Sequence, residues 1–139
     1  MKTKDKTILE VEAFKGKEIL LVEDVELNRE IAETILTEAG FHVNSVEDGK
    51  QAVDYMESEK GNMIDLNLMD VMMPVMDGYE ATQKIRQLED KTKADIPIIV
   101  MTANAFEEDA KAAIEAGMNA HMAKPIRIES LYEIIEQYL

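Results

Sequence analysis

Five side chains with reactive or ligating groups each follow an apolar stretch of this 139-residue sequence: Glu23, Asp24, Asp70, Thr102 and Lys124. Clustered carboxylates repel one another, and a hard divalent cation that prefers oxygen ligands, such as Mg²⁺, relieves that repulsion. A carboxylate can also attack phosphorus, and phosphoryl transfer needs mainly positioning and neutralisation of charge. The set therefore predicts a magnesium-dependent phosphoryl site with Asp70 as the nucleophile. Glu23 and Asp24 would favour metal, Thr102 would hydrogen-bond a phosphoryl oxygen and Lys124 would supply the counter-charge.

Short apolar runs that are typical of buried β-strands occur five times along the chain, at 19–22, 43–46, 65–70, 97–101 and 120–122. Amphipathic helical patterns separate these runs, and a further one closes the chain. Alternation of this kind predicts an α/β fold with a doubly wound parallel sheet and helices on both faces. Functional groups in such sheets lie beyond the carboxyl ends of the strands, so the five side chains are expected to converge there.

The apolar stripes of the predicted helices are expected to face the core. Asp48 is a plausible N-cap and Gly40 a plausible helix stop. The stripe of the first helix consists of Leu27, Ile31, Ala32, Ile35, Leu36 and Ala39. The helix before Gly117 contributes Ile114 to its own stripe in the same way.

Composition narrows the function classes. The sequence has no cysteine, which excludes disulfides, thiolate zinc sites and thiol nucleophiles. It has only two histidines, so a histidine-rich metal site is not expected. A formal net charge of −14 opposes binding to nucleic acid, so no direct DNA binding is expected. No apolar run is long enough to cross a bilayer and no signal-peptide core is seen, so a cytoplasmic location without membrane contact is expected.

The polar, irregular stretch 1–17 is interpreted as an N-terminal linker or lead-in, followed by one domain at 18–139. Four motifs in that domain resemble the response-regulator receiver family: ILLVED at 19–24, LMDVMMPVMDG at 68–78, MTA at 101–103 and KPI at 124–126. The resemblance implies the flavodoxin-like strand order 2-1-3-4-5. It also implies transfer of a phosphoryl group from a phosphohistidine, on a histidine kinase or a histidine phosphotransfer domain, to Asp70.

The resemblance further implies a ligand set for Mg²⁺, with Mn²⁺ as a substitute. Asp24, Asp70 and the Met72 carbonyl would bind the ion, and Glu23 would act through water. The amides of Met72 and Ala103 would contact the phosphoryl group. The domain alone would promote only its own phosphorylation and dephosphorylation.

A conformational switch is implied as well. Thr102 would move toward the phosphoryl group while His121 changes rotamer. Output would pass by protein contacts through one face of the domain, which is formed by the helix before Gly117, the strand at 120–122 and the final helix. His121 is equally compatible with a partly buried imidazole that only packs at a strand end. The methionines near Asp70 are interpreted as core and loop packing.

The stretch from Lys15 to Ala32 and the motif at 76–82 look like the receiver of a hybrid sensor histidine kinase; a stand-alone single-domain response regulator is the near alternative. A magnesium-dependent aspartyl-phosphate phosphatase is a more distant alternative, because that class requires a second acid two residues after the nucleophile, where this sequence has Met72. A phosphorylation-independent interaction module is the other distant alternative. The resemblance to receivers also implies that Met72 and Asn104 tune the lifetime of the acyl phosphate.

One residue departs from the family pattern. Asn67 lies inside the third apolar run, where receivers usually carry an apolar side chain. A buried amide needs hydrogen-bond partners, so Asn67 is expected either to disturb packing or to be partly exposed.

Overall fold

A computed structural model describes residues 15–71, 75–102, 111, 114–123 and 126–138. Its five strands are β1 (Glu18–Val22), β2 (His42–Val46), β3 (Leu66–Asp70), β4 (Ile98–Thr102) and β5 (Ala120–Ala123). Its helices are α2 (Glu26–Glu38), α3 (Gly49–Glu57), α4 (Gly78–Arg86), α5 (Lys91–Ala94) and α7 (Ile128–Ile135), with a 3-10 turn η1 (Glu59–Met63). The predicted strands agree with these bounds to within one residue.

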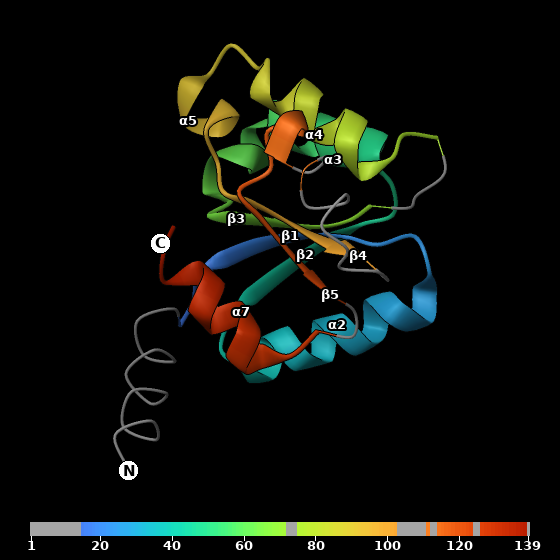
Figure 1. Cartoon of the computed structure of the whole chain (residues 1–139), viewed down its shortest axis with the longest axis vertical. Helices are drawn as coiled ribbons and strands as arrows, with labels where there is room; N and C mark the ends of the chain where they lie inside the picture. The colour runs from blue at the N-terminus through green and yellow to red at the C-terminus, as the bar shows by residue number, and fades with distance from the viewer. Residues whose placement is uncertain (1–14, 72–74, 103–110, 112–113, 124–125, 139) are drawn as a thin grey trace.

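The strands form one parallel sheet in the order β2-β1-β3-β4-β5, which confirms the predicted fold class and strand order. Strands β1, β3 and β4 are central, and all of β3 and β4 is buried. Central strands of this kind are mostly apolar in sequence because helices cover both faces of the sheet. In Figure 1, α3, α4 and α5 lie above the sheet, and α2 and α7 lie below it.

Each face of the sheet has its own apolar core. Above the sheet, Val53 and Met56 of α3 and Ile85 of α4 pack over Leu20 and Met69. Below it, the packed residues come mainly from β1, β3, β4, β5, α2 and α7, and include Ile19, Leu36, Leu68, Ile99 and Leu131.

Local signals set the ends of the helices. The Asp48 and Asp77 side chains accept hydrogen bonds from the backbone N–H groups of Gln51 and Glu80, which caps α3 and α4. Gly40 follows α2 with a φ of +104°, a conformation that ends helices and favours glycine. The cap at Asp48 and the stop at Gly40 are as predicted.

Helix α2 corrects the predicted core stripe. Ala32 and Leu36 are buried, but Leu27 is 64% exposed and Ile31 is 48% exposed. The helix rests on the sheet along the line of Ala32 and Leu36, which turns Leu27 and Ile31, spaced four residues apart, toward solvent. Ile114 is likewise exposed, at 68%, so its assignment to the core was also wrong.

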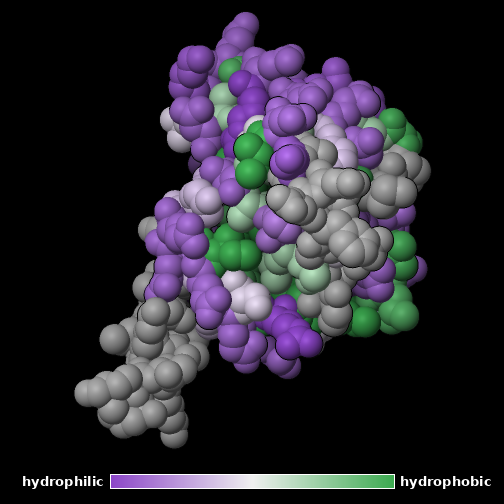
Figure 2. Space-filling model, viewed as in Figure 1, coloured by the Kyte–Doolittle hydropathy of each residue, from purple (hydrophilic) through white to green (hydrophobic). Residues whose placement is uncertain are grey.

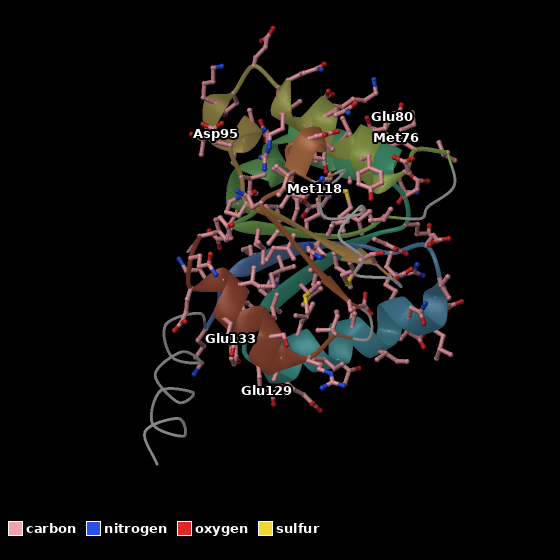
Figure 3. The ribbon with its side chains drawn as sticks, in the orientation of Figure 1. Met76, Glu80, Asp95, Met118, Glu129 and Glu133 are labelled. Carbon is pink, nitrogen blue, oxygen red and sulfur yellow. The ribbon has the colours of Figure 1, made fainter. Side chains whose placement is uncertain are left out.

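Helix α7 follows its predicted pattern. Leu131, Tyr132 and Ile135 are buried against the lower face of the sheet. Glu129 and Glu133 stand on the opposite side of the helix, as Figure 3 shows. Beyond the helix, the Tyr138 hydroxyl donates a hydrogen bond of 2.9 Å to the Asn119 carbonyl.

Arg86 ties elements together at the amino ends of β4 and β5. Its guanidinium donates to the carbonyl oxygens of Gly117, Ala94 and Ile96 and to the Asn119 side chain, at 2.6–2.8 Å. Burial lowers the pKa of the Arg86 guanidinium, and the carboxylate of Asp95 opposes that shift. All four acceptors lie at the edge of the sheet opposite to the predicted site.

Asn67 is fully buried, which overturns the expectation of partial exposure. Its register partners are Leu20 on β1 and Ile98 on β4, both fully buried. Neither its Oδ1 nor its Nδ2 has a hydrogen-bond partner among the described residues. A buried amide left without partners costs free energy, so Asn67 lowers the stability of the upper core.

The backbone before β1 is already attached to the domain. The Gly16 N–H donates to the Gly40 carbonyl, and the Lys17 carbonyl accepts from the His42 N–H. The linker interpretation of 1–17 stays a prediction, because 1–14 lie outside the described residues. None of the described helices is long and apolar enough to span a membrane.

We predict that Asn67→Leu raises the free energy of unfolding by about 2 kcal/mol, because an apolar side chain of similar shape replaces an unpaired amide. Urea denaturation followed by circular dichroism measures this change. Asn44→Leu is the matched control. Asn44 lies on β2 and pairs with Leu20 from the strand opposite to β3, and its amide donates a hydrogen bond of 2.8 Å to the Glu18 carboxylate. The control should lose stability, and a loss in Asn67→Leu as well would contradict the prediction.

Candidate functional site

The register of the sheet brings the predicted site residues to one edge. Val22 of β1 pairs with Met69 of β3, so the residues that follow them, Glu23 and Asp70, are neighbours. Asp70 in turn pairs with Met101, directly before Thr102. Adjacent parallel strands therefore end together, as the alternation of strands and helices predicted.

Three carboxylates converge at this edge. Glu23, Asp24 and Asp70 each offer one oxygen, and these oxygens all lie within 4.8 Å of one another. Glu23 is 2% exposed and Asp70 is 5% exposed, while Asp24 is partly exposed. Burial raises the cost of leaving like charges unneutralised, and carboxylate oxygens are ligands that Mg²⁺ prefers. The residues present thus fit a hard divalent cation.

The loop after β1 is held by its own hydrogen bonds. The Glu23 N–H donates to the Val46 carbonyl at 3.2 Å, which ties the loop to β2. One Glu23 carboxylate oxygen accepts from the Val25 N–H at 3.1 Å, at the start of α2. One oxygen of Glu23 therefore holds the loop backbone just before α2.

The segment after Asp70 passes close to α4. The Val71 carbonyl accepts from the Gly78 N–H at 3.0 Å, and a Cβ at position 78 would lie 2.6 Å from the Asp70 carbonyl oxygen. Only glycine allows that approach. Val75 has a φ of +68°, a left-handed conformation that is unfavourable for a β-branched residue.

Thr102 and His121 lie on neighbouring strands, β4 and β5. Thr102 ends β4, is 9% exposed and pairs with Ala123. His121 of β5 pairs with Val100 and is partly buried. The other predicted site residues, Met72, Ala103 and Lys124, lie outside the described residues, as does Asn104.

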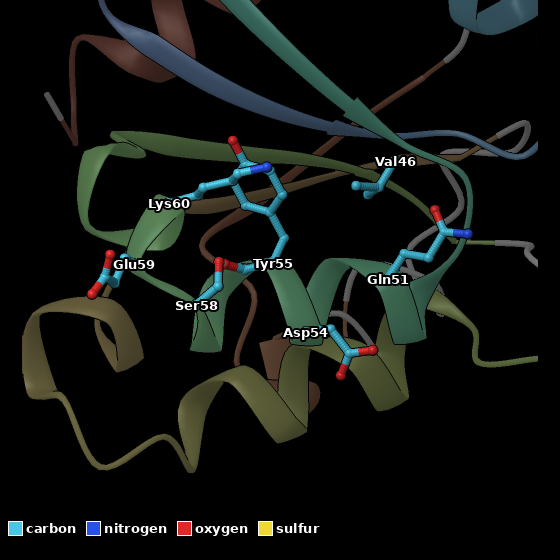
Figure 4. Close-up of a pocket in the computed structure, with 7 residues that line it drawn as sticks. All are labelled: Val46, Gln51, Asp54, Tyr55, Ser58, Glu59 and Lys60. Atoms are coloured by element: carbon cyan, nitrogen blue, oxygen red, sulfur yellow. The ribbon is translucent and has the colours of Figure 1, made fainter.

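A groove of about 660 Å³ lies elsewhere, beside α3 and η1. Its lining residues include Val46, Asp54, Tyr55 and Lys60 (Figure 4). It shares no residue with the acid cluster. The sequence analysis did not identify Arg29 as a residue of this region. Its guanidinium donates a hydrogen bond to the Glu23 carbonyl, and the one signal in the sequence was its position one helical turn into α2.

The comparison with protein families settles the membership of the chain. Residues 19–136 match the response regulator receiver domain model. The chain belongs to the response regulator receiver family. Its curated relatives include hybrid signal transduction histidine kinase I of Dictyostelium discoideum, 39% identical over 86% of this chain, and probable histidine kinase 6 of Oryza sativa subsp. japonica, 33% identical over 88%. This receiver spans 7% and 14% of the lengths of those two proteins.

Solved receivers agree with the fold. One is the receiver of sensor histidine kinase PA1611 from Pseudomonas aeruginosa PAO1, which was solved with magnesium in its active-site cleft. It is 41% identical to this chain, with a TM-score of 0.77 and coverage of 88% of this chain and 97% of that one. The receiver of histidine kinase CKI1 from Arabidopsis thaliana, complexed with Mg²⁺ and BeF₃⁻, is 30% identical, with a TM-score of 0.78 and coverage of 95% of each chain.

The strain at Val75 makes a prediction about this receiver. Val75→Asn should raise the free energy of unfolding by about 1 kcal/mol, because asparagine tolerates the left-handed conformation better than a β-branched residue. Thermal unfolding measures the change. Val75→Ala keeps the Cβ and only removes the branch, so it should gain less; equal or lower stability of Val75→Asn would contradict a strained backbone at this position.

Proposed function

We propose that this receiver accepts a phosphoryl group from a phosphohistidine onto the Asp70 carboxylate, with Mg²⁺ as cofactor. One observation carries the proposal: three carboxylates lie within 4.8 Å of one another at the edge of a receiver sheet. Asp24, Asp70 and the Met72 carbonyl would hold the ion, with Glu23 acting through water. Mn²⁺, which also accepts oxygen ligands, would substitute for it.

The transfer moves one phosphoryl group between two protein side chains. A carboxylate oxygen of Asp70 forms a bond to phosphorus while the bond from phosphorus to the donor imidazole nitrogen breaks. The electron pair of that bond stays on the imidazole. A cation held by these residues would neutralise negative charge on the phosphoryl oxygens, and Lys124 and Thr102 are assigned to the same oxygens. No nucleophile besides Asp70 is needed.

The acyl phosphate would act as a switch. New contacts from Thr102 to the phosphoryl group would favour a second packing of the sheet edge, and the population would shift toward it. His121 is assigned the coupled change of rotamer, since it lies on β5 beside β4. Output would pass through the face formed by the helix before Gly117, β5 and α7. The net charge of −14 favours a protein partner over DNA.

The domain is assigned to a hybrid sensor histidine kinase, with 1–17 as the linker and 18–139 as the receiver. Relatives of that class support this assignment. A stand-alone response regulator is the alternative. In either setting the domain would catalyse only its own phosphorylation and dephosphorylation, and a cytoplasmic location stays a prediction.

The exposed apolar residues at the start of α2 support a docking surface for the donor. Val25, Leu27 and Ile31 are 46%, 64% and 48% exposed, directly after the two acids of the β1–α2 loop. Figure 2 shows apolar surface over this end of α2, at the lower right of the view. Exposed apolar groups at the mouth of a polar site mark a protein interface. A co-crystal structure of the Saccharomyces cerevisiae histidine phosphotransfer protein Ypd1 with the receiver domain of Ssk1 provides a precedent for such a partner. The match in that structure is 26% identical to this chain, with a TM-score of 0.78 and coverage of 90% of each chain.

The phosphoryl chemistry is tested by intact mass after incubation with acetyl phosphate. We expect wild type to gain one phosphoryl group only in the presence of Mg²⁺, and Asp70→Asn to gain none. Asp77→Asn is the control, since Asp77 is another acid near the site and asparagine also caps helices. No gain in wild type, from acetyl phosphate or from a phosphorylated histidine phosphotransfer protein, would overturn the proposal and favour an interaction module. Sustained turnover of a small phosphate ester would favour a phosphatase.

The docking surface makes a separate prediction. Leu27→Asp should slow transfer from a phosphorylated histidine phosphotransfer protein about tenfold, because a charge replaces an apolar contact. Labelling by acetyl phosphate should stay at the wild-type rate. Met63→Asp is the control, since Met63 is 66% exposed but lies in η1, which precedes the amino end of β3. Equal slowing in both variants would contradict donor docking on α2.

A further inference from the structure

The β1–α2 loop must keep two acids next to a third before any cation binds. Glu23 and Asp24 have oxygens within 4.8 Å of Asp70, and like charges at this distance repel one another. Hydrogen bonds to the loop backbone oppose its displacement. Two of these involve the Glu23 N–H and carboxylate, as described above; a third involves its carbonyl.

The carbonyl oxygen of Glu23 accepts a 2.9 Å hydrogen bond from Nη1 of Arg29. Arg29 lies one turn into α2, where its own N–H donates to the Val25 carbonyl at 2.9 Å. Its side chain is only 17% exposed. The guanidinium thus reaches back from the helix to the last residue before Asp24.

The other end of the guanidinium lies 4.0 Å from the Glu47 carboxylate, which is 64% exposed. A pair at that distance with a largely exposed carboxylate contributes little. The hydrogen bond to the Glu23 carbonyl is therefore the main polar contact that the structure gives Arg29. A planar guanidinium with fixed donors suits this task better than a flexible ammonium group.

We propose that Arg29 is a positioning residue for the cation site: it fixes the backbone between Glu23 and Asp24 so that both carboxylates are already placed when Mg²⁺ arrives. Residues behind the ligands of a metal site set its affinity by orienting those ligands. The inference rests on the proposed function, since it assigns Mg²⁺ to this site. Arg29 makes no contact with the phosphoryl group in this role.

Arg86 provides a matched comparison. It too is a half-buried arginine whose guanidinium donates to backbone carbonyls, but those carbonyls lie at the opposite edge of the sheet. Substitution of Arg86 should lower the stability of the fold without changing the positions of the three acids. The comparison separates a local effect on the cation site from a general loss of stability.

The test is the dissociation constant for Mg²⁺ of the unphosphorylated protein, measured by NMR titration of backbone amides. Arg29→Met should raise this constant about tenfold, Arg29→Lys should recover part of the loss, and Arg86→Met should leave it unchanged. Thermal unfolding of each variant without Mg²⁺ records its stability. Unchanged or tighter Mg²⁺ binding by Arg29→Met would overturn the inference, as would an equal loss in Arg86→Met.

Phosphorylation by acetyl phosphate adds a second readout. In Arg29→Met the Mg²⁺ concentration for half-maximal rate should rise about tenfold, while the rate at saturating Mg²⁺ approaches that of wild type. A lower saturating rate with an unchanged half-maximal concentration would overturn the positioning role. Failure of wild type itself to be phosphorylated would instead count against the proposed function, and Mg²⁺ binding would still test Arg29.

Discussion

Repulsion between three carboxylates is the constraint on which the site depends. Glu23, Asp24 and Asp70 have oxygens within 4.8 Å of one another, and two of the three residues are nearly inaccessible to solvent. A fixed backbone around the three residues opposes this repulsion. The parallel sheet provides that support, because the register of β1 and β3 places Glu23 beside Asp70 and the loops are tied to β2 and α2.

The same sheet contains features that work against stability. Asn67 places an unpaired amide in the upper core three residues before Asp70, and Val75 adopts a left-handed backbone five residues after it. Strain and unsatisfied polar groups cluster near functional sites in many proteins, since the surrounding fold can carry their cost. Here the apolar cores on both faces of β3 carry it.

The two ends of the sheet are held in different ways. At the carboxyl end, polar groups converge and the surface nearby is partly apolar, which suits chemistry and contact with a partner. At the amino end, Arg86 binds four acceptors and joins α4 to the segments before β4 and β5. This division would let the carboxyl end change its packing in the proposed switch while the amino end keeps its structure.

The sequence by itself determined the strands, the cap at Asp48 and the acids at the strand ends, because these depend on short-range patterns. The order of the strands in the sheet came instead from the resemblance of the motifs to receivers. It did not determine which side of α2 faces the sheet: Leu27 and Ile31 have the spacing of core residues, yet the helix rests on Ala32 and Leu36. Nor did it reveal that Asn67 is fully buried or that Arg29 holds the Glu23 carbonyl. Those facts depend on how helices rotate and pack on the sheet, and only the tertiary structure fixes that geometry.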